Sequence, residues 1–534
     1  MTPKLPVGRR HAMKGIVVAA SAAVALAAVP AAQARPDFDG NVLVPGSVVV
    51  SGSVYHPADI TPGVTQLPPN CTGSNCVTAT NDGTYPFVFN NDAVDSSFGI
   101  TSPAYLYDMD RHGSPMRTIP IPTSDFVTSF SSKSEMALNF STDRRDLTLM
   151  GYAAPVDAID VSNSNTPGVI DPTNPVPDAY YRVVADLGDS GKFHFTETNA
   201  YSGNNGRAAV LNSAANVLYT AGNAGNGGNP QPSGVVNGAG AQILSPSLEP
   251  ESAQSPGAPT PVGSFNITEL GDKADKLGKD TNFRGLTIHD NVVYLTKGSG
   301  SNGVNTVYFI DTTGHACPSG TGLPVPGAAL PTSPIAYTSY NMCILQGFNT
   351  ALAKTDTTDF PFGIWFANPD TLYVADEGDG STAYDSATNT YSDAAAQTTA
   401  GLQKWVFNGI SWTRAYTLQD GLNLGQPYVV RGYPTGTNTV GTGTSAVTLP
   451  WAPATDGLRN ISGRVNRDGT ATIYAVTSTV SGSGDQGADP NKVVKITDKL
   501  RATSPGRESF ATFARAASGQ VLRGVAVVPS PGRG

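Results

Sequence analysis

The sequence predicts an all-β fold with many turns, and its composition gives the first two observations. Glycine (58 residues) and proline (41 residues) make up about 19% of the 534 residues, against a usual level near 12%. Only seven of the 42 acidic residues are glutamate, so aspartate, which favours turns, outnumbers the acidic residue that favours helices. The hydrophobic fraction of 39% is too high for a disordered chain and is sufficient for a buried core.

A short repeated pattern is the third observation, and it predicts the architecture. In each copy, a strand that contains a small residue is followed by a polar turn and by an L-Y-x-x-like strand. The clearest copy is PFGIWFANPDTLYVADEGDG at 361–380, continued by LQKWVFNG from Leu402 and SWTRAYTL from Ser411. These segments predict four strands in succession, which is the make-up of one β-propeller blade.

Seven copies of the pattern align on their opening strands, with spacings between 37 and 97 residues. Repeated units of this size predict a seven-bladed β-propeller, with six or eight blades as alternatives. The last copy is too short for a blade, whereas the strand-like segment 42–55 precedes the first copy without an opening motif. We expect these two segments to pair and to close the ring. The aligned positions are Phe98, Glu135, Arg207, Arg284, Phe362, Arg459 and Arg523.

The copy around Phe362 resembles the repeat of NHL, YVTN and lactonase-like propellers, and the general pattern covers about residues 98–530. The resemblance implies a propeller domain over residues 35–534, but no single activity, because these propellers include hydrolases, lyases, phytases and binding scaffolds. It also implies acidic and amide metal ligands in the channel, although their full set cannot be matched to this chain. The spacing is more irregular than in those repeats, and a low-complexity insertion at about 222–264 is expected to be a surface loop.

Residues 1–34 have the pattern of a signal peptide. A basic segment precedes the apolar run 15–29, and Ala32-Gln33-Ala34 matches an A-x-A cleavage site. The run is shorter than the roughly 20 residues that span a membrane, so we expect cleavage rather than a membrane anchor. Arg9 and Arg10 leave the choice between general and twin-arginine export open. We therefore expect a secreted or periplasmic protein.

Cleavage would make the chain more acidic. It removes four basic residues, so the formal net charge falls by four, from −9 to −13. This balance argues against a nucleic-acid partner or an anionic membrane surface. The basic residues removed are Lys4, Arg9, Arg10 and Lys14.

Four cysteines remain after cleavage. An even number in an oxidising compartment predicts two disulfide bonds, most simply Cys71 with Cys76 and Cys317 with Cys343. The alternative is one zinc site formed by all four thiolates, which the C-x4-C spacing and an exported location disfavour.

Four of the seven opening strands carry an arginine. Because opening strands line the channel of a propeller, these guanidinium groups could form a ring that binds a carboxylate or a phosphate. The alternative is structural, with each arginine paired to an aspartate of a neighbouring blade or covering apolar strand edges with its stem. The predicted ligand-binding residues are Arg207, Arg284, Arg459 and Arg523.

Acidic residues provide the candidates for metal binding and catalysis. Glu135 occupies the register of the four arginines in the second copy, and it is a weak catalytic candidate. Asp376, Glu377 and Asp379 lie close together in ADEGDG and offer the oxygen ligands that Ca²⁺ prefers. The alternative for this segment is a tight turn, in which aspartate and glycine are common.

The sequence contains no G-x-S-x-G elbow, no P-loop and no dinucleotide-binding fingerprint followed by a helix. We therefore expect a secreted binding or scaffold protein that recognises a ligand, in particular an anionic one, at the channel mouth and loop face. The alternative is a secreted metal-dependent hydrolase of the lactonase, esterase or phytase-like kind, in which Glu135 or Asp376 holds a metal that activates water. We expect a monomer whose ligand is a small molecule or an extracellular polymer.

Overall fold

In the computed structural model, the described part of the chain begins at Gly40. The residues described are 40–68, 71, 76–90, 99–132, 135–167, 171, 174, 176–223, 240–246, 282–299, 303–332, 342–441 and 443–530. The predicted signal peptide, Phe98 and most of the predicted insertion 222–264 lie outside these residues. Among the described residues, no helix is both long and apolar enough to cross a membrane.

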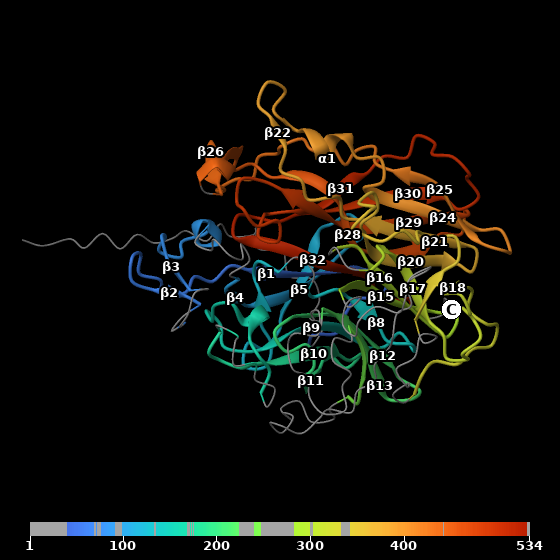
Figure 1. The fold of residues 1–534 in the computed structure, drawn as a ribbon. Coiled ribbons are helices and arrows are strands. Elements are labelled where there is room, and N and C mark those ends of the chain that lie inside the picture. The colour runs from blue at the N-terminus through green and yellow to red at the C-terminus, as the bar shows by residue number, and fades with distance from the viewer. Residues whose placement is uncertain are drawn as a thin grey trace, which may run out of the picture. The chain divides into compact units, whose positions relative to one another are not determined.

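The described residues form an all-β propeller built from antiparallel sheets (Figure 1). In the described part of the chain the only α-helix is α1 (Ser392–Ala396), beside the short 3-10 helices η1 (Phe87–Asn90), η2 (Val161–Asn163) and η3 (Gly443–Ser445). Four two-stranded ribbons lie outside the blades. They pair β2 (Gln66–Leu67) with β3 (Val77–Thr78), β4 (Thr101–Ser102) with β7 (Thr128–Ser129), β22 (Tyr384–Asp385) with β23 (Thr390–Tyr391), and β26 (Thr437–Val440) with β27 (Val447–Pro450).

Six sheets of the described residues form the blades, and the strands of each are named from the innermost outward. The closing blade has β32 (Gln520–Val527), β1 (Val48–Val54), β5 (Ala104–Met109) and β6 (Pro115–Pro120). Blade 2 has β8 (Asn139–Phe140), β9 (Leu147–Ala153), β10 (Tyr181–Leu187) and β11 (Phe193–Thr198). Blade 3 has β12 (Gly206–Asn212), β13 (Val217–Gly222) and β14 (Ala241–Leu244).

The other three blades follow in chain order. Blade 4 has β15 (Phe283–His289), β16 (Val292–Lys297), β17 (Thr306–Ile310), β19 (Met342–Leu345) and β18 (Thr321–Gly322), the last pair being parallel. Blade 5 has β20 (Pro361–Asn368), β21 (Thr371–Asp376), β24 (Gly401–Phe407) and β25 (Trp412–Leu418). Blade 6 has β28 (Ala454–Val465), β29 (Thr470–Val480), β30 (Lys492–Lys499) and β31 (Ala511–Arg515).

The two chain ends close the ring, as the sequence predicts. In Figure 1 the C-terminal strand β32, drawn red, lies beside the N-terminal strand β1, drawn blue. Val48 pairs with Val527 at one end of this ladder and Val54 with Gln520 at the other. On its other side, β1 pairs with β5. Both edges of β1 are therefore occupied, which leaves no open strand edge at this junction.

The described part of the structure has six blades rather than seven, which is one of the two alternatives that the sequence left open. The strands after Phe98 do not form a blade of their own: β5 and β6 are the outer half of the closing blade. The physical reason is that β1, β5 and β6 form one sheet without an innermost strand of their own. The C-terminal strand β32 fills that position. β14 lies within the stretch 222–264 predicted as an insertion, where it completes the described part of blade 3.

The small residue of the repeat allows the inner strands of neighbouring blades to approach closely. A Cβ atom built on Gly285 would lie 2.2 Å from the carbonyl oxygen of Phe362 in the next blade. The same atom on Gly524 would lie 2.4 Å from the carbonyl oxygen of Met136, across the closed ring junction. Distances this short exclude any side chain, so glycine is required at these two contacts between neighbouring blades.

Apolar clusters fill the spaces between adjacent blades. Leu106 and Leu149 belong to a cluster shared by the closing blade and blade 2, and Tyr219 and Leu295 to one shared by blades 3 and 4. These side chains are buried, so the strands are covered on both faces, which suits a chain with only 14% charged residues.

Both predicted disulfide bonds are present. Cys71 pairs with Cys76, and Cys317 pairs with Cys343 at the start of β19. Asp311 lies close to the second pair, but the sulfur atoms there are joined to each other and offer no thiolate. The bonds therefore leave no ligands for the four-thiolate zinc site.

Asp186 in β10 gives the fold a pH-dependent stability. Its Oδ1 atom is buried without a hydrogen-bond partner in the described structure, and burial raises the pKa of the carboxyl from 3.8 to about 7, with Asp146 and Asp143 adding to the shift. The folded state therefore keeps this proton to higher pH than the unfolded state does, so stability falls between about pH 4 and pH 7.

We expect Asp186→Asn to remove this dependence. The free energy of unfolding should rise by about 2 kcal/mol at pH 8 and stay nearly unchanged at pH 4, because the native carboxyl is then neutral. Urea unfolding at the two pH values measures the difference. An equal effect at both pH values would contradict the titration of Asp186.

Candidate functional site

Six charged side chains, one from each blade, form what we call the charged ring around the inner strands. Each is at most 4% exposed, so the group lies inside the protein. In blade order, one glutamate is followed by two arginines, and this order occurs twice around the ring. The members are Glu135, Arg207, Arg284, Glu377, Arg459 and Arg523.

Electrostatic coupling connects neighbours of the ring. Burial is the main cause that lowers the pKa of Arg207, and its charge is also coupled to Arg284, Glu377 and Glu135. Burial likewise lowers the pKa of Arg523 to about 10, and its guanidinium is coupled to Glu135 and Arg459. These interactions connect the four predicted arginines with Glu135 and with Glu377, which the sequence analysis did not place among them. Ligand binding by the arginines stays a prediction.

One pair of the ring is a direct ion pair. Nε of Arg459 lies 3.3 Å from Oε2 of Glu377, and both side chains are about 5% exposed. Arg459 therefore has the acidic partner that the structural alternative requires, but from a glutamate rather than an aspartate.

Glu135 accepts three hydrogen bonds from its own blade and its surroundings. The donors are the hydroxyl of Thr128 at 2.8 Å, the backbone N–H of Ser129 at 3.2 Å and the hydroxyl of Tyr152. The guanidinium of Arg182 stacks over the Tyr152 ring at 5.3 Å. Burial and the charge of Glu135 both raise the pKa of Tyr152, so the phenol remains a donor.

Arg207 and Arg523 donate hydrogen bonds to backbone carbonyls and also have N–H groups without a partner among the described residues. Nη1 of Arg207 donates to the carbonyl of Phe283 at 2.8 Å, and Nη2 of Arg523 donates to the carbonyl of Ser129 at 3.1 Å. Nε of Arg207, and both Nε and Nη1 of Arg523, are buried without a hydrogen-bond partner among the described residues. Buried donors of this kind are costly unless a further group satisfies them.

A cavity of about 290 Å³ adjoins the ring. Glu377 lines it directly, and Ser299, another lining residue, accepts a hydrogen bond from Arg284. Asp379 and Asp456 lie on its wall, and burial raises the pKa of Asp456 to about 7. The cavity therefore has an acidic wall and lies next to the arginines of the charged ring.

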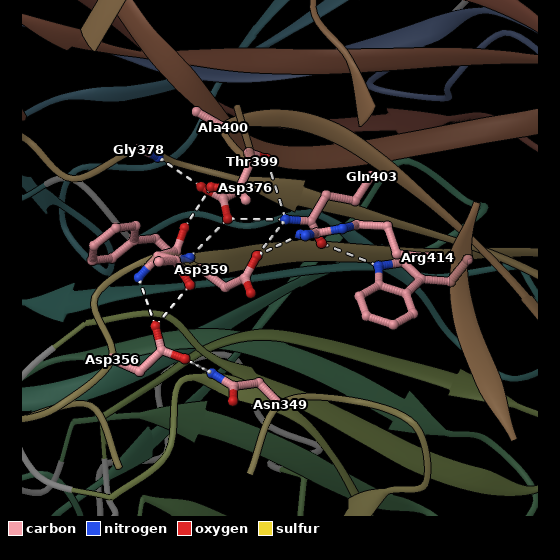
Figure 2. Close-up of polar contacts among 12 residues, drawn as sticks. Asn349, Asp356, Asp359, Asp376, Gly378, Thr399, Ala400, Gln403 and Arg414 are labelled. Atoms are coloured by element: carbon pink, nitrogen blue, oxygen red, sulfur yellow. Dashed lines mark hydrogen bonds and ion pairs between the residues drawn. The ribbon is translucent and has the colours of Figure 1, made fainter. Parts of the chain in front are cut away.

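Asp376 organises a polar network, drawn in Figure 2, whose partners Phe360 and Gly378 line this cavity. Its Oδ2 atom accepts hydrogen bonds from the N–H of Phe360 at 2.7 Å and from the side chain of Gln403 at 3.1 Å. Oδ1 accepts one from the N–H of Gly378 at 3.0 Å. Burial nevertheless raises the pKa of Asp376 to about 7, and Asp359 and Glu377 add to the shift.

The predicted calcium ligands are not gathered around one point. In the described residues, the only group of three or more acidic, histidine or cysteine ligands whose atoms lie within 4.8 Å of one another is Asp311 with the disulfide Cys317–Cys343. Asp379 accepts from Gln397 and Ser381, and Glu377 pairs with Arg459. Calcium binding at Asp376, Glu377 and Asp379 stays a prediction, and it would require these oxygens to exchange their present partners for the ion.

Several residues of the site were missed by the sequence analysis. Examples are Tyr152, Arg182 and Asp456, which lie on strands where alternation predicts burial but not which polar side chain takes part in the site. Glu377 was predicted only as a calcium ligand, and the signal for its place in the charged ring is its position directly after the second strand of blade 5.

No protein-family model and no curated protein matches this chain. The solved structures similar to it include a quinoprotein alcohol dehydrogenase-like protein of Bacteroides thetaiotaomicron, with 10% identity, a TM-score of 0.24, and coverage of 92% of this chain and 96% of that chain. They also include the hemagglutinin-neuraminidase of parainfluenza virus 5, with 10% identity, a TM-score of 0.29, and coverage of 90% and 94%. These values assign neither a family nor an activity, and the resemblance to NHL, YVTN and lactonase-like repeats extends only to the propeller fold.

Proposed function

We propose that this protein binds a small ligand with a carboxylate or phosphate group at the mouth of the propeller channel. One observation carries the proposal: four buried arginines share the charged ring with two glutamates, and Arg207 and Arg523 retain buried N–H groups without partners among the described residues. An excess of buried positive charge is unfavourable, and an anion would offset it while accepting these hydrogen bonds. The two disulfide bonds favour an oxidising, extracellular or periplasmic location for this binding protein.

The cavity beside the ring suggests how such a ligand would be oriented. Its anionic end would face Arg284 and Arg459, which lie beyond Ser299 and Glu377. Hydroxyl or amine groups at the other end would meet Asp379 and Asp456 on the cavity wall. A hydroxy acid or an acidic sugar has this combination of groups.

Calorimetric titration with inorganic phosphate, citrate and glucuronate tests the proposal. Arg284→Gln and Arg459→Gln should each weaken binding of the preferred anion about 10-fold to 100-fold, because each removes a charge-assisted hydrogen bond of about 1.5 to 3 kcal/mol. Lys192→Gln, which changes an exposed lysine, is the control and should bind as the unchanged protein does. The proposal is wrong if none of the three anions binds, or if all variants bind equally.

The hydrolase alternative stays a prediction. Glu135 would have to release the hydroxyl of Thr128 or Tyr152 before it could bind a metal ion. Ester or lactone hydrolysis that is lost with EDTA and restored by one metal ion would support it.

A further inference from the structure

A second cavity, of about 630 Å³, lies where the closing blade meets blade 6. We call it the outer groove. Four basic residues line it: Arg111 and His112 from the turn between β5 and β6, Arg464 from β28 and Lys495 from β30. None of the residues that line this groove in the described structure is acidic. The groove is therefore a basic site on a chain whose formal net charge is −9.

The turn that carries Arg111 and His112 is fixed against blade 6. The ammonium group of Lys495 donates a hydrogen bond to the carbonyl of Arg111 at 3.2 Å. A Cβ atom built on Gly113 would lie 2.1 Å from the carbonyl oxygen of Phe513, so the turn touches the backbone of β31. The backbone of this turn, almost 400 positions from Lys495 in the sequence, is thus held beside the groove before any ligand arrives, which lowers the entropic cost of binding.

Arg464 offers a buried donor to this groove. Its Nε atom is buried and has no hydrogen-bond partner among the described residues. Tyr474 lines the same groove; burial raises the pKa of its phenol, while the charges of Arg464 and Arg111 act to lower it. Arg464 and Arg111 therefore both lie within electrostatic range of Tyr474, and both line the groove, so their positive charges favour an anion there.

The rest of the groove is suited to a polyhydroxylated ligand. Thr472, Thr497 and Ser509 contribute hydroxyl groups, and Ile496 and Ala511 contribute a small apolar surface. The exposed Thr497 and Ser509 lie toward solvent, where sugar hydroxyls could exchange water for protein hydrogen bonds. The volume is within the range of sites for small organic molecules.

We propose that the outer groove binds a sugar that carries a tetrahedral oxyanion ester, the anion held by Arg464, Arg111 and Lys495 and the sugar by the hydroxyl-bearing residues. A phosphate ester and a sulfate ester present the same oxygen geometry, so both sources fit this site. The inference is independent of the channel, because none of the six residues of the charged ring lines the outer groove.

Calorimetric titration with glucose 6-phosphate, glucose 6-sulfate and uncharged glucose tests this site. We expect at least one ester to bind more than 10-fold tighter than glucose, and the preferred ester identifies its source. The double variant Arg464→Gln, Lys495→Gln should weaken ester binding at least 10-fold. The double variant Lys192→Gln, Arg431→Gln removes two exposed positive charges elsewhere and should leave binding unchanged.

The channel variant Arg459→Gln separates the two sites. It should retain ester binding in the outer groove even where it loses binding of citrate or glucuronate. Circular dichroism and thermal melting confirm that each variant is folded. The proposal is overturned if neither ester binds more tightly than glucose, if the groove variant binds as the unchanged protein does, or if the control double variant weakens binding to the same extent.

Discussion

Replacement of Asp498 by alanine should lower the free energy of unfolding by about 3 to 5 kcal/mol, the usual cost of breaking a buried ion pair from one side. Asp498 and Lys404 are both fully buried, with Nζ of Lys404 3.0 Å from Oδ2 of Asp498. Alanine would leave the ammonium group inside the protein without its counter-charge. Its remaining partners, such as the carbonyl of Lys499 at 2.6 Å, are neutral and cannot replace the carboxylate.

Two tyrosine hydroxyl groups also contact this ion pair, which joins two blades. Tyr373 donates to Asp498 at 2.5 Å, and Tyr416 donates to its other oxygen at 2.8 Å. Burial is the main cause that raises the pKa of both phenols far above its ordinary value, and Asp498 adds to it, so both remain donors at neutral pH. Lys404, Tyr373 and Tyr416 belong to blade 5, whereas Asp498 belongs to β30 of blade 6. The network therefore holds neighbouring blades together by a charge rather than by apolar contact alone.

Urea unfolding at pH 7 measures the effect, with two controls. Tyr416→Phe removes two hydrogen bonds, the one donated to Asp498 and the one accepted from Lys404, and should cost about 2 kcal/mol. Asp189→Ala breaks the exposed pair with Arg145 and should leave stability unchanged within error. The double variant Lys404→Met, Asp498→Leu removes both charges and should recover much of the lost stability. A loss below about 1 kcal/mol for Asp498→Ala would show that the pair is not an important link.

The repeat predicted the blades well where one continuous segment forms a whole blade. The segment from Pro361 forms the four strands of blade 5 in the predicted order, because turn residues and alternating apolar residues are local signals. The closing blade was miscounted because its strands come from both ends of the chain. Pairing of β1 with β32 is a contact across more than 460 residues, and no local pattern states how many such partners share one sheet.

The candidate site shows the same limit. The register of the opening strands placed Arg207 and Arg523 in one ring, and both side chains are buried in the structure. Ligand binding by these arginines stays a prediction. Glu377 was predicted as a calcium ligand because it lies between two aspartates, yet the fold turns it toward Arg459 in the next blade. The neighbouring aspartates suggested a calcium ion as the partner of Glu377, whereas the fold places Arg459 of the next blade beside it. The basic groove could not be predicted at all, because Arg111 meets Arg464 and Lys495 only after the ring has closed.

Replacement of Gly363 by alanine should lower the free energy of unfolding by about 3 kcal/mol, at the upper end for an added methylene in a packed core. A Cβ atom there would lie 2.5 Å from the carbonyl oxygen of Arg459 and 2.8 Å from the backbone nitrogen of Ile461. Both contacts are backbone atoms of β28, so no side chain can rotate away to relieve them. The inner strands of blades 5 and 6 would have to separate.

This substitution should also weaken binding of an anion in the channel. Separation of the two strands moves Arg459 relative to Glu377, and both belong to the charged ring. Gly188→Ala is the matched control, because there the nearest atom to the new Cβ is a carboxylate oxygen of Asp146 at 3.3 Å, which can move aside. Urea unfolding and calorimetry on both variants test the two effects. If Gly363→Ala is as stable as the control variant, neighbouring blades can move apart at little cost. If it is less stable but binds the anion normally, the geometry of the charged ring does not depend on how closely the blades pack.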